Sequence, residues 1–170
     1  MKTKKSRSVY PNERAMYADV CQWLEDLLKA RFKRTQVYVA DTSAVTLSNY
    51  LERAGFAKFF PDYQTFEINV DVTGVVKSKE PSVSFVECKI TVLTLRDLSQ
   101  LLGYSRVAQP AFSTLISSAG ISKALSLLLR IYRRYDVLEY TDGKRLHIGV
   151  WDSVRKTIDP ATLIPPGSHM

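Results

Sequence analysis

Hydrophobic and polar residues alternate over two neighbouring stretches, 66–76 and 82–90, which are separated by the polar segment 77–81. Val, Ile and Phe fill the apolar positions, a composition typical of strands on a partly buried sheet. The pattern therefore predicts an antiparallel hairpin. Because side chains of a strand alternate between two faces, Glu87 and Lys89 share one face of the second strand. Asp71 lies on the polar face of the first strand, so the three side chains are expected to meet.

Helical spacing of apolar residues predicts four helices, at 11–32, 45–54, 94–107 and 120–134. Thr42 or Ser43 is expected to cap the second helix, and Thr94 with Asp97 resembles a capping box at the third. Further strands are predicted at 36–40 and 111–117, and a second hairpin pairs 137–141 with 146–151 around Asp142-Gly143. This order of elements predicts an α/β fold with a mixed central sheet flanked by helices.

A chain of 170 residues suits one domain with a full-sized core. We expect a basic tail at 1–10, the domain at 11–158 and a proline-marked C-terminal tail at 159–166. Residues 167–170 read Gly-Ser-His-Met, the remnant of an expression vector, so His169 is no candidate ligand. The lone strand residue His147 is expected to be structural or exposed and not catalytic.

Composition narrows the range of partners. A net charge of +7 favours polyanionic partners such as nucleic acid. No apolar run approaches the length of a membrane span, and no secretory leader is evident, which predicts a cytoplasmic protein with no membrane partner. Cys21 and Cys88 are expected to be reduced core thiols, and no cysteine cluster with metal-binding spacing is present.

Two acids beside one lysine within apolar strands are a costly arrangement for stability alone, because unpaired buried charge is unfavourable and paired buried charge gains little. The same residues also fit a plain ion pair between Lys89 and Glu87 or Asp71 on an exposed sheet face. The residues alone leave both interpretations open.

Asp71, followed after fifteen residues by Glu87-Cys88-Lys89, resembles the signature of the PD-(D/E)xK nucleases. The helix after this motif carries Gln100 and Tyr104, four residues apart and so on one helical face. A Gln-x-x-x-Tyr helix in this place resembles the RecB-like branch of that superfamily. Some members of this branch hold an iron–sulfur cluster on four cysteines, which this chain lacks.

The resemblance implies a restriction-endonuclease-like fold and a Mg²⁺-dependent deoxyribonuclease in which Mn²⁺ can replace Mg²⁺. Asp71, Glu87 and the main-chain carbonyl of Cys88 would bind the metal, and Lys89 would assist the attacking water. Gln100 and Tyr104 would brace the site or the substrate phosphate. DNA is the expected partner, and a homodimer is compatible with cutting two strands.

Three assignments keep alternatives. An acid on the first helix of many members points into the active site, and Glu13 is the matching position with Glu25 as the second choice. Pro61-Asp62 spells the "PD" of the family name, but Asp71 is preferred because Asp62 follows a proline in an expected loop. The alternative function is a non-catalytic nucleic-acid-binding or assembly module on the same fold. A different phosphodiester or phosphoryl hydrolase is a third, weaker option.

Overall fold

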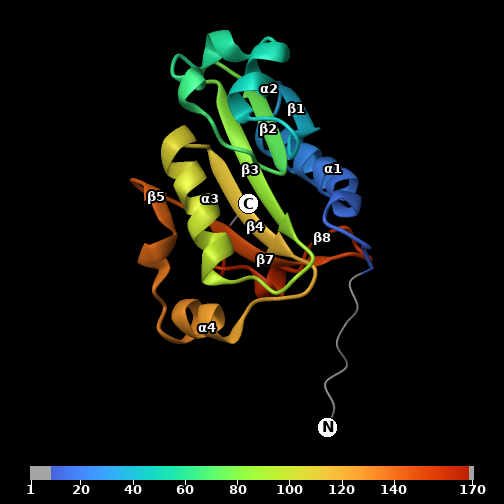
Figure 1. The fold of residues 1–170 in the computed structure, drawn as a ribbon, viewed down its shortest axis with the longest axis vertical. Helices are drawn as coiled ribbons and strands as arrows, with labels where there is room; N and C mark the ends of the chain where they lie inside the picture. The colour runs from blue at the N-terminus through green and yellow to red at the C-terminus, as the bar shows by residue number, and fades with distance from the viewer. Residues whose placement is uncertain (1–8, 169–170) are drawn as a thin grey trace.

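A six-stranded mixed sheet runs through the centre of the computed structural model, which describes residues 9–168 (Figure 1). In spatial order its strands are β1 (Gln36–Asp41), β2 (Val72–Lys77), β3 (Ser82–Lys89), β4 (Phe112–Ser117), β7 (His147–Asp152) and β8 (Thr157–Ile158). Strand β2 is antiparallel to both of its neighbours, β1 and β3. Strands β3, β4 and β7 are parallel, and β8 is antiparallel to β7. The prediction of a mixed sheet flanked by helices is confirmed.

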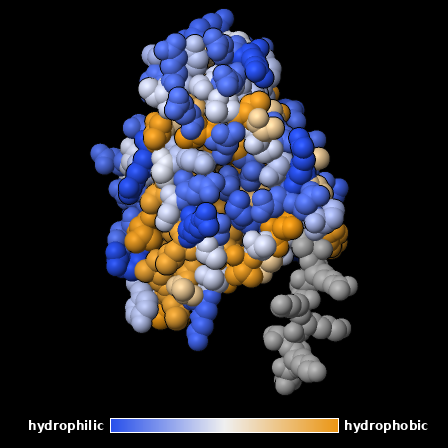
Figure 2. All heavy atoms as spheres, in the orientation of Figure 1, coloured by the Kyte–Doolittle hydropathy of each residue, from blue (hydrophilic) through white to orange (hydrophobic). Residues whose placement is uncertain are grey.

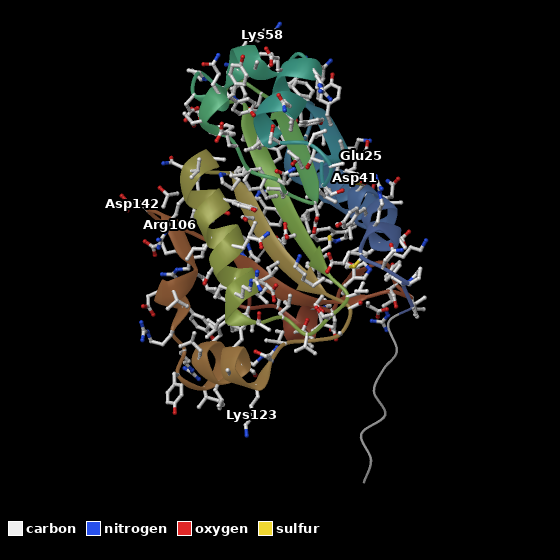
Figure 3. The ribbon with its side chains drawn as sticks, viewed as in Figure 1. Glu25, Asp41, Lys58, Arg106, Lys123 and Asp142 are labelled. Carbon is white, nitrogen blue, oxygen red and sulfur yellow. The ribbon has the colours of Figure 1, made fainter. Side chains whose placement is uncertain are left out.

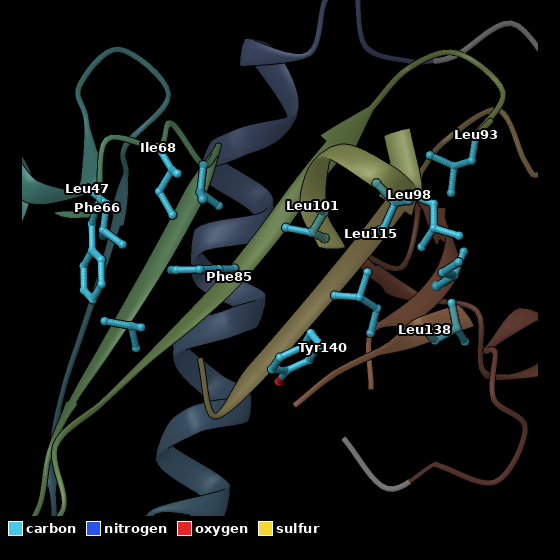
Figure 4. Packing of buried hydrophobic residues seen from close by; sticks show 14 of the residues in the cluster. Leu47, Phe66, Ile68, Phe85, Leu93, Leu98, Leu101, Leu115, Leu138 and Tyr140 are labelled. Carbon is cyan, nitrogen blue, oxygen red and sulfur yellow. The ribbon is translucent and has the colours of Figure 1, made fainter. Parts of the chain in front are cut away.

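Helices cover both faces of the sheet. Helix α1 (Arg14–Arg31) packs Val20 and Leu24 against a cluster that includes Val86 and Cys88. Helix α3 (Leu95–Ala108) packs Leu101 and its neighbours on the opposite face, against Phe85 and Leu115 (Figure 4). Strand β3 is therefore buried on both sides, and its polar residues Ser84 and Glu87 are buried with it.

The smaller helices are α2 (Leu47–Arg53) and α4 (Lys123–Ser126), and α4 continues into a π-helical turn, Leu127–Ile131. Short 3₁₀ turns lie at Ala57–Phe59, Tyr63–Thr65, Tyr135–Leu138 and Pro160–Thr162. The predicted capping box of Thr94 and Asp97 is confirmed. The predicted cap of α2 is wrong, because Thr46 caps this helix while the Thr42 hydroxyl donates to the carbonyl of Val70.

The first hairpin is shorter than predicted. Only residues 72–77 form its first strand: β1 ends at Asp41, opposite Val72, and the pairing with β3 also stops at Val72, opposite Val86. Carbonyls in the preceding segment, 66–71, instead accept hydrogen bonds from Leu47 and Ser48 at the start of α2. Alternation of buried and exposed residues persists along 66–70, which is why the segment reads as a strand.

The predicted second hairpin divides into two parts. Strands β5 (Glu139–Thr141) and β6 (Lys144–Arg145) form a small two-stranded sheet around the Asp142-Gly143 turn. The following strand, β7, leaves this hairpin and pairs in parallel with β4, which contradicts the predicted pairing of 137–141 with 146–151. The buried side chains of Leu146 and Ile148 explain this choice, since both belong to the main core.

The segment expected as a proline-marked tail packs back onto the sheet. Ile164 is buried, and its main chain exchanges two hydrogen bonds with Ile148. The expected basic tail lies outside the described residues as far as residue 8, as does His169. No helix within residues 9–168 has the length and apolar character to cross a membrane.

Hydrophilic and hydrophobic residues are unevenly distributed over one face of the molecule (Figure 2). Hydrophilic side chains gather over the end that carries α2, and hydrophobic side chains gather towards the end that carries α4. Among the exposed hydrophobic residues are Leu127, Ile131 and Tyr132 of the π-helical turn and its end.

Candidate active site

Five of the residues singled out in the sequence come together at one edge of the sheet. Glu87 and Lys89 lie at the C-terminal end of β3, and Asp71 immediately precedes β2. Glu13 immediately precedes α1, and Gln100 comes from the first half of α3. The prediction that Asp71, Glu87 and Lys89 meet is therefore supported by the geometry, although Asp71 lies in a bend and not within a strand.

The Asp71 carboxylate is held by two donors. Its Oδ2 accepts a hydrogen bond from the main-chain N–H of Cys88 at 2.8 Å, and its Oδ1 accepts one from the Tyr17 hydroxyl at 2.7 Å. The first bond ties Asp71 to the strand that carries Glu87 and Lys89. Burial and the neighbouring Asp71 charge raise the pKa of Tyr17, so its hydroxyl remains a donor.

Glu87 is the centre of a second set of contacts. Its Oε1 lies 3.0 Å from Lys89 Nζ and accepts a hydrogen bond of 3.2 Å from Gln100 Nε2. Lys89 Nζ lies 3.8 Å from Glu13 Oε2, so one ammonium group faces two carboxylates. The first-helix acid thus reaches the cluster from α1, while Gln100 reaches it from the other face of the sheet.

Glu87 is electrostatically strained. The residue is only 3% exposed, and burial followed by repulsion from Asp71 raises its pKa from 4.5 to about 7, against the opposing effect of Lys89. Its Oε2 is buried without a hydrogen-bond partner among the described residues. For Lys89, burial lowers the pKa, but the combined attraction of Glu87, Asp71 and Glu13 outweighs burial and the net shift is upward. A buried acceptor without a donor costs about 1–3 kcal/mol.

The donor set fits a hard divalent cation in part. Carboxylate oxygens are the ligands that Mg²⁺ prefers, and a buried, unpartnered oxygen such as Glu87 Oε2 gains most from a cation. Within residues 9–168, however, no group of three or more His, Cys, Asp or Glu side chains is arranged to hold a metal ion. Two carboxylates, from Asp71 and Glu87, are therefore the side-chain ligands that the cluster offers. The Cys88 thiol is buried in the core beneath α1 and offers none.

Three other candidates take different positions. Tyr104 packs its ring against the core cluster beneath α3. Glu25 pairs with Lys29 and lines a cavity of about 490 Å³ beside β1, on the side of the molecule where Figure 3 labels it. Asp62 is exposed in the turn before residues 63–65. Among the described residues, no hydrogen bond or ion pair joins any of these three side chains to Asp71, Glu87 or Lys89.

Tyr17 is the member of the cluster that sequence reasoning missed as a site residue. It is four residues after Glu13, so both lie on one face of α1. This spacing was a usable signal, but Tyr17 also fits the apolar stripe of the helix, and the stripe alone explains its presence.

No protein-family model matches this chain, and neither a curated protein nor a solved structure matches it significantly. The chemistry of the cluster therefore has to be argued from its own residues.

Proposed function

We propose that the chain is a metal-dependent nuclease that hydrolyses phosphodiester bonds in DNA, with a restriction-endonuclease-like fold closest to the RecB-like branch. One observation carries this proposal. Burial, followed by repulsion from the Asp71 carboxylate, raises the pKa of Glu87 to about 7, and one oxygen of Glu87 is buried without a hydrogen-bond partner among the described residues. Strongly shifted carboxyl groups of this kind concentrate at functional sites.

A structural ion pair accounts poorly for these features. Pairing Lys89 with Glu87 satisfies one carboxylate oxygen and leaves the other orphaned. Replacing such a pair by apolar side chains is often neutral or stabilising, so stability alone gives little reason to retain it. Stability lost at an active site in exchange for function is a familiar trade-off.

Asp71 and Glu87 would hold Mg²⁺ or Mn²⁺, with the main-chain carbonyl of Cys88 as a further oxygen ligand. When bound, the cation would supply Lewis-acid stabilisation of the phosphate and an activated water. Lys89, held 3.0 Å from Glu87, would orient the attacking water and offset charge that develops on the phosphate. Glu13 and Gln100 would fix the position of Lys89 and Glu87 through the contacts already described.

The net charge of +7 supports a polyanionic substrate. Without an obvious base-reading motif, binding would rely on phosphate contacts and shape. A homodimer would place two such sites on one duplex, and a cytoplasmic location would give access to DNA.

A non-catalytic nucleic-acid-binding or assembly module is the second candidate. Both oxygens of Asp71 already accept hydrogen bonds, and the described residues contain no group of three or more metal-ligating side chains. These two features favour a cluster whose charged groups are held by hydrogen bonds and have no catalytic role.

A cleavage assay separates the two candidates. Labelled single-stranded, double-stranded and branched DNA, and RNA, are incubated with Mg²⁺, Mn²⁺ or EDTA. The nuclease proposal predicts cation-dependent cutting of DNA that is abolished in Asp71→Asn and Glu87→Gln, while Glu67→Gln, at an exposed position outside the cluster, cuts normally. Binding without cutting in all four proteins would support the non-catalytic module instead.

A further inference from the structure

A cavity lies at the opposite end of β3 and β4 from the candidate active site. It has a volume of about 410 Å³ and is lined by the following residues: Arg31, Ala111, Phe112, Tyr140, Gly143, Lys144, Arg145, His147, Pro165 and Ser168. Ser84 pairs with Phe112 and Lys89 pairs with Ser117, so five residues of β4, roughly 17 Å, separate this cavity from Lys89. The cavity is therefore distinct from the candidate active site.

The lining of this cavity is strongly cationic. Arg31, Lys144 and Arg145 contribute three positive charges, and no Asp or Glu is among the lining residues. Two acids lie in the hairpin that carries Lys144 and Arg145: Glu139 pairs with Arg145 at 3.5 Å, and Asp142 is at the tip, at the edge of the molecule in Figure 3. An exposed pair such as Arg145–Glu139 contributes little, so Arg145 can exchange its partner at small cost.

Phe112, Tyr140 and His147 add aromatic rings to the wall of the cavity. The rings of Phe112 and His147 are stacked, with centroids 5.5 Å apart, and the Tyr140 hydroxyl donates to the carbonyl of Pro110. Burial, followed by the positive charge of Arg31, lowers the pKa of His147, so its imidazole is less readily protonated. Arginine and lysine in a concave site bind phosphate oxygens through charge-assisted hydrogen bonds.

We propose that this cavity binds the phosphate group of a small anionic ligand, with Arg31, Lys144 and Arg145 as the contacting cations. The site does not depend on the proposed nuclease activity. A phosphate held beside Arg31 offsets its charge, so ligand binding raises the pKa of His147 and changes its imidazole signals.

NMR titration of the full chain tests this proposal, because the sequence contains only two histidines, His147 and His169. Inorganic phosphate, deoxyadenosine monophosphate and a 5′-phosphorylated oligonucleotide are added separately at constant ionic strength. We expect a saturable shift of the His147 signals with the first two probes. Equal affinity for both identifies phosphate alone as the ligand, and tighter binding of the mononucleotide assigns a contact to the aromatic wall.

The variant pair is matched in charge. Lys144→Ala with Arg145→Ala is expected to weaken phosphate binding at least tenfold. Arg53→Ala with Lys58→Ala removes the same charge near the end of the molecule where Figure 3 labels Lys58 and leaves binding unchanged. Ser168 lines the cavity from the expected vector remnant, so the chain ending at Pro166 is titrated as well and keeps its affinity.

Four results would overturn the proposal. The first three are the absence of a saturable shift, an equal shift in both double variants, and binding that is lost on removal of residues 167–170. The fourth is a response to the oligonucleotide alone, which would assign the three cations to a nucleic-acid path.

Discussion

The main-chain N–H of Cys88 donates a hydrogen bond of 2.8 Å to Asp71 Oδ2, seventeen positions earlier in the chain. This bond fixes a carboxylate from a bend against a strand that is buried on both faces. Asp71 therefore lies near Glu87, whose pKa is raised by burial and then by the Asp71 charge, and the cost to stability can be measured.

Glu87→Gln is expected to stabilise the protein above neutral pH. Burial and Asp71 raise the pKa of Glu87 from 4.5 to about 7, so the folded state binds the extra proton and loses stability as pH rises through this window. Above pH 7 this shift corresponds to a loss of roughly 3 kcal/mol in the free energy of unfolding. The neutral amide in Glu87→Gln would avoid that loss. Urea denaturation at pH 8 is expected to show a gain of about 1–3 kcal/mol, with little gain at pH 4.5.

The exposed Glu67→Gln serves as the control and leaves the free energy of unfolding unchanged at both pH values. If Glu87→Gln instead lowered the stability at pH 8, the Lys89–Glu87 contact would be a stabilising ion pair, and the interpretation of Glu87 as a strained site residue would fail.

Tyr17→Phe removes the hydroxyl that donates to Asp71 Oδ1 and keeps the buried ring. Hydrogen bonds to charged groups contribute about 1.5–3 kcal/mol, so we expect a loss of that order in the free energy of unfolding. Tyr132→Phe, at a residue that is 70% exposed, is the matched control and changes little. Equal stability of the two variants in urea denaturation would show that the Tyr17 hydroxyl does not hold Asp71.

Gln100 and Tyr104 are expected to behave differently in cleavage, although the sequence resemblance placed both in the site. Gln100→Ala removes a donor to Glu87 Oε1 and should slow cleavage several-fold. Tyr104→Phe keeps the ring that packs against the core and should leave the rate unchanged. Single-turnover cleavage rates measure both effects. A larger loss of rate in Tyr104→Phe than in Gln100→Ala would show that the Tyr104 hydroxyl belongs to the site.

Much of the fold could be predicted because the strands and helices carry their own periodicity. Strand β4 and the capping box of α3 follow from local sequence alone. The true start of β2 could not be predicted, since it depends on where β1 ends. The parallel pairing of β7 with β4 could not be predicted either, because Asp142-Gly143 indicates a hairpin turn but not the strand with which the following residues pair.

Part of the candidate site could be predicted for the same reason. Glu87 and Lys89 share a strand face, so their proximity follows from a period of two. Their contacts with Glu13 and Gln100 depend on where α1 and α3 cross the sheet, which the resemblance suggested and periodicity did not. The Tyr17–Asp71 bond spans fifty-four positions; the spacing of Glu13 and Tyr17 places Tyr17 on the right helix face but does not indicate Asp71 as its partner.

Calorimetric titration with Mg²⁺ or Mn²⁺ at two pH values tests most directly whether Asp71 and Glu87 hold a cation. Because the pKa of Glu87 is about 7, cation binding at pH 6.5 should release a substantial fraction of one proton, and binding at pH 8.5 almost none. Buffers of different ionisation enthalpy measure this release. We predict that Glu87→Gln loses both the binding and the proton release. Cation binding that releases no proton and survives in Glu87→Gln, or no binding in the wild-type chain, would contradict the account.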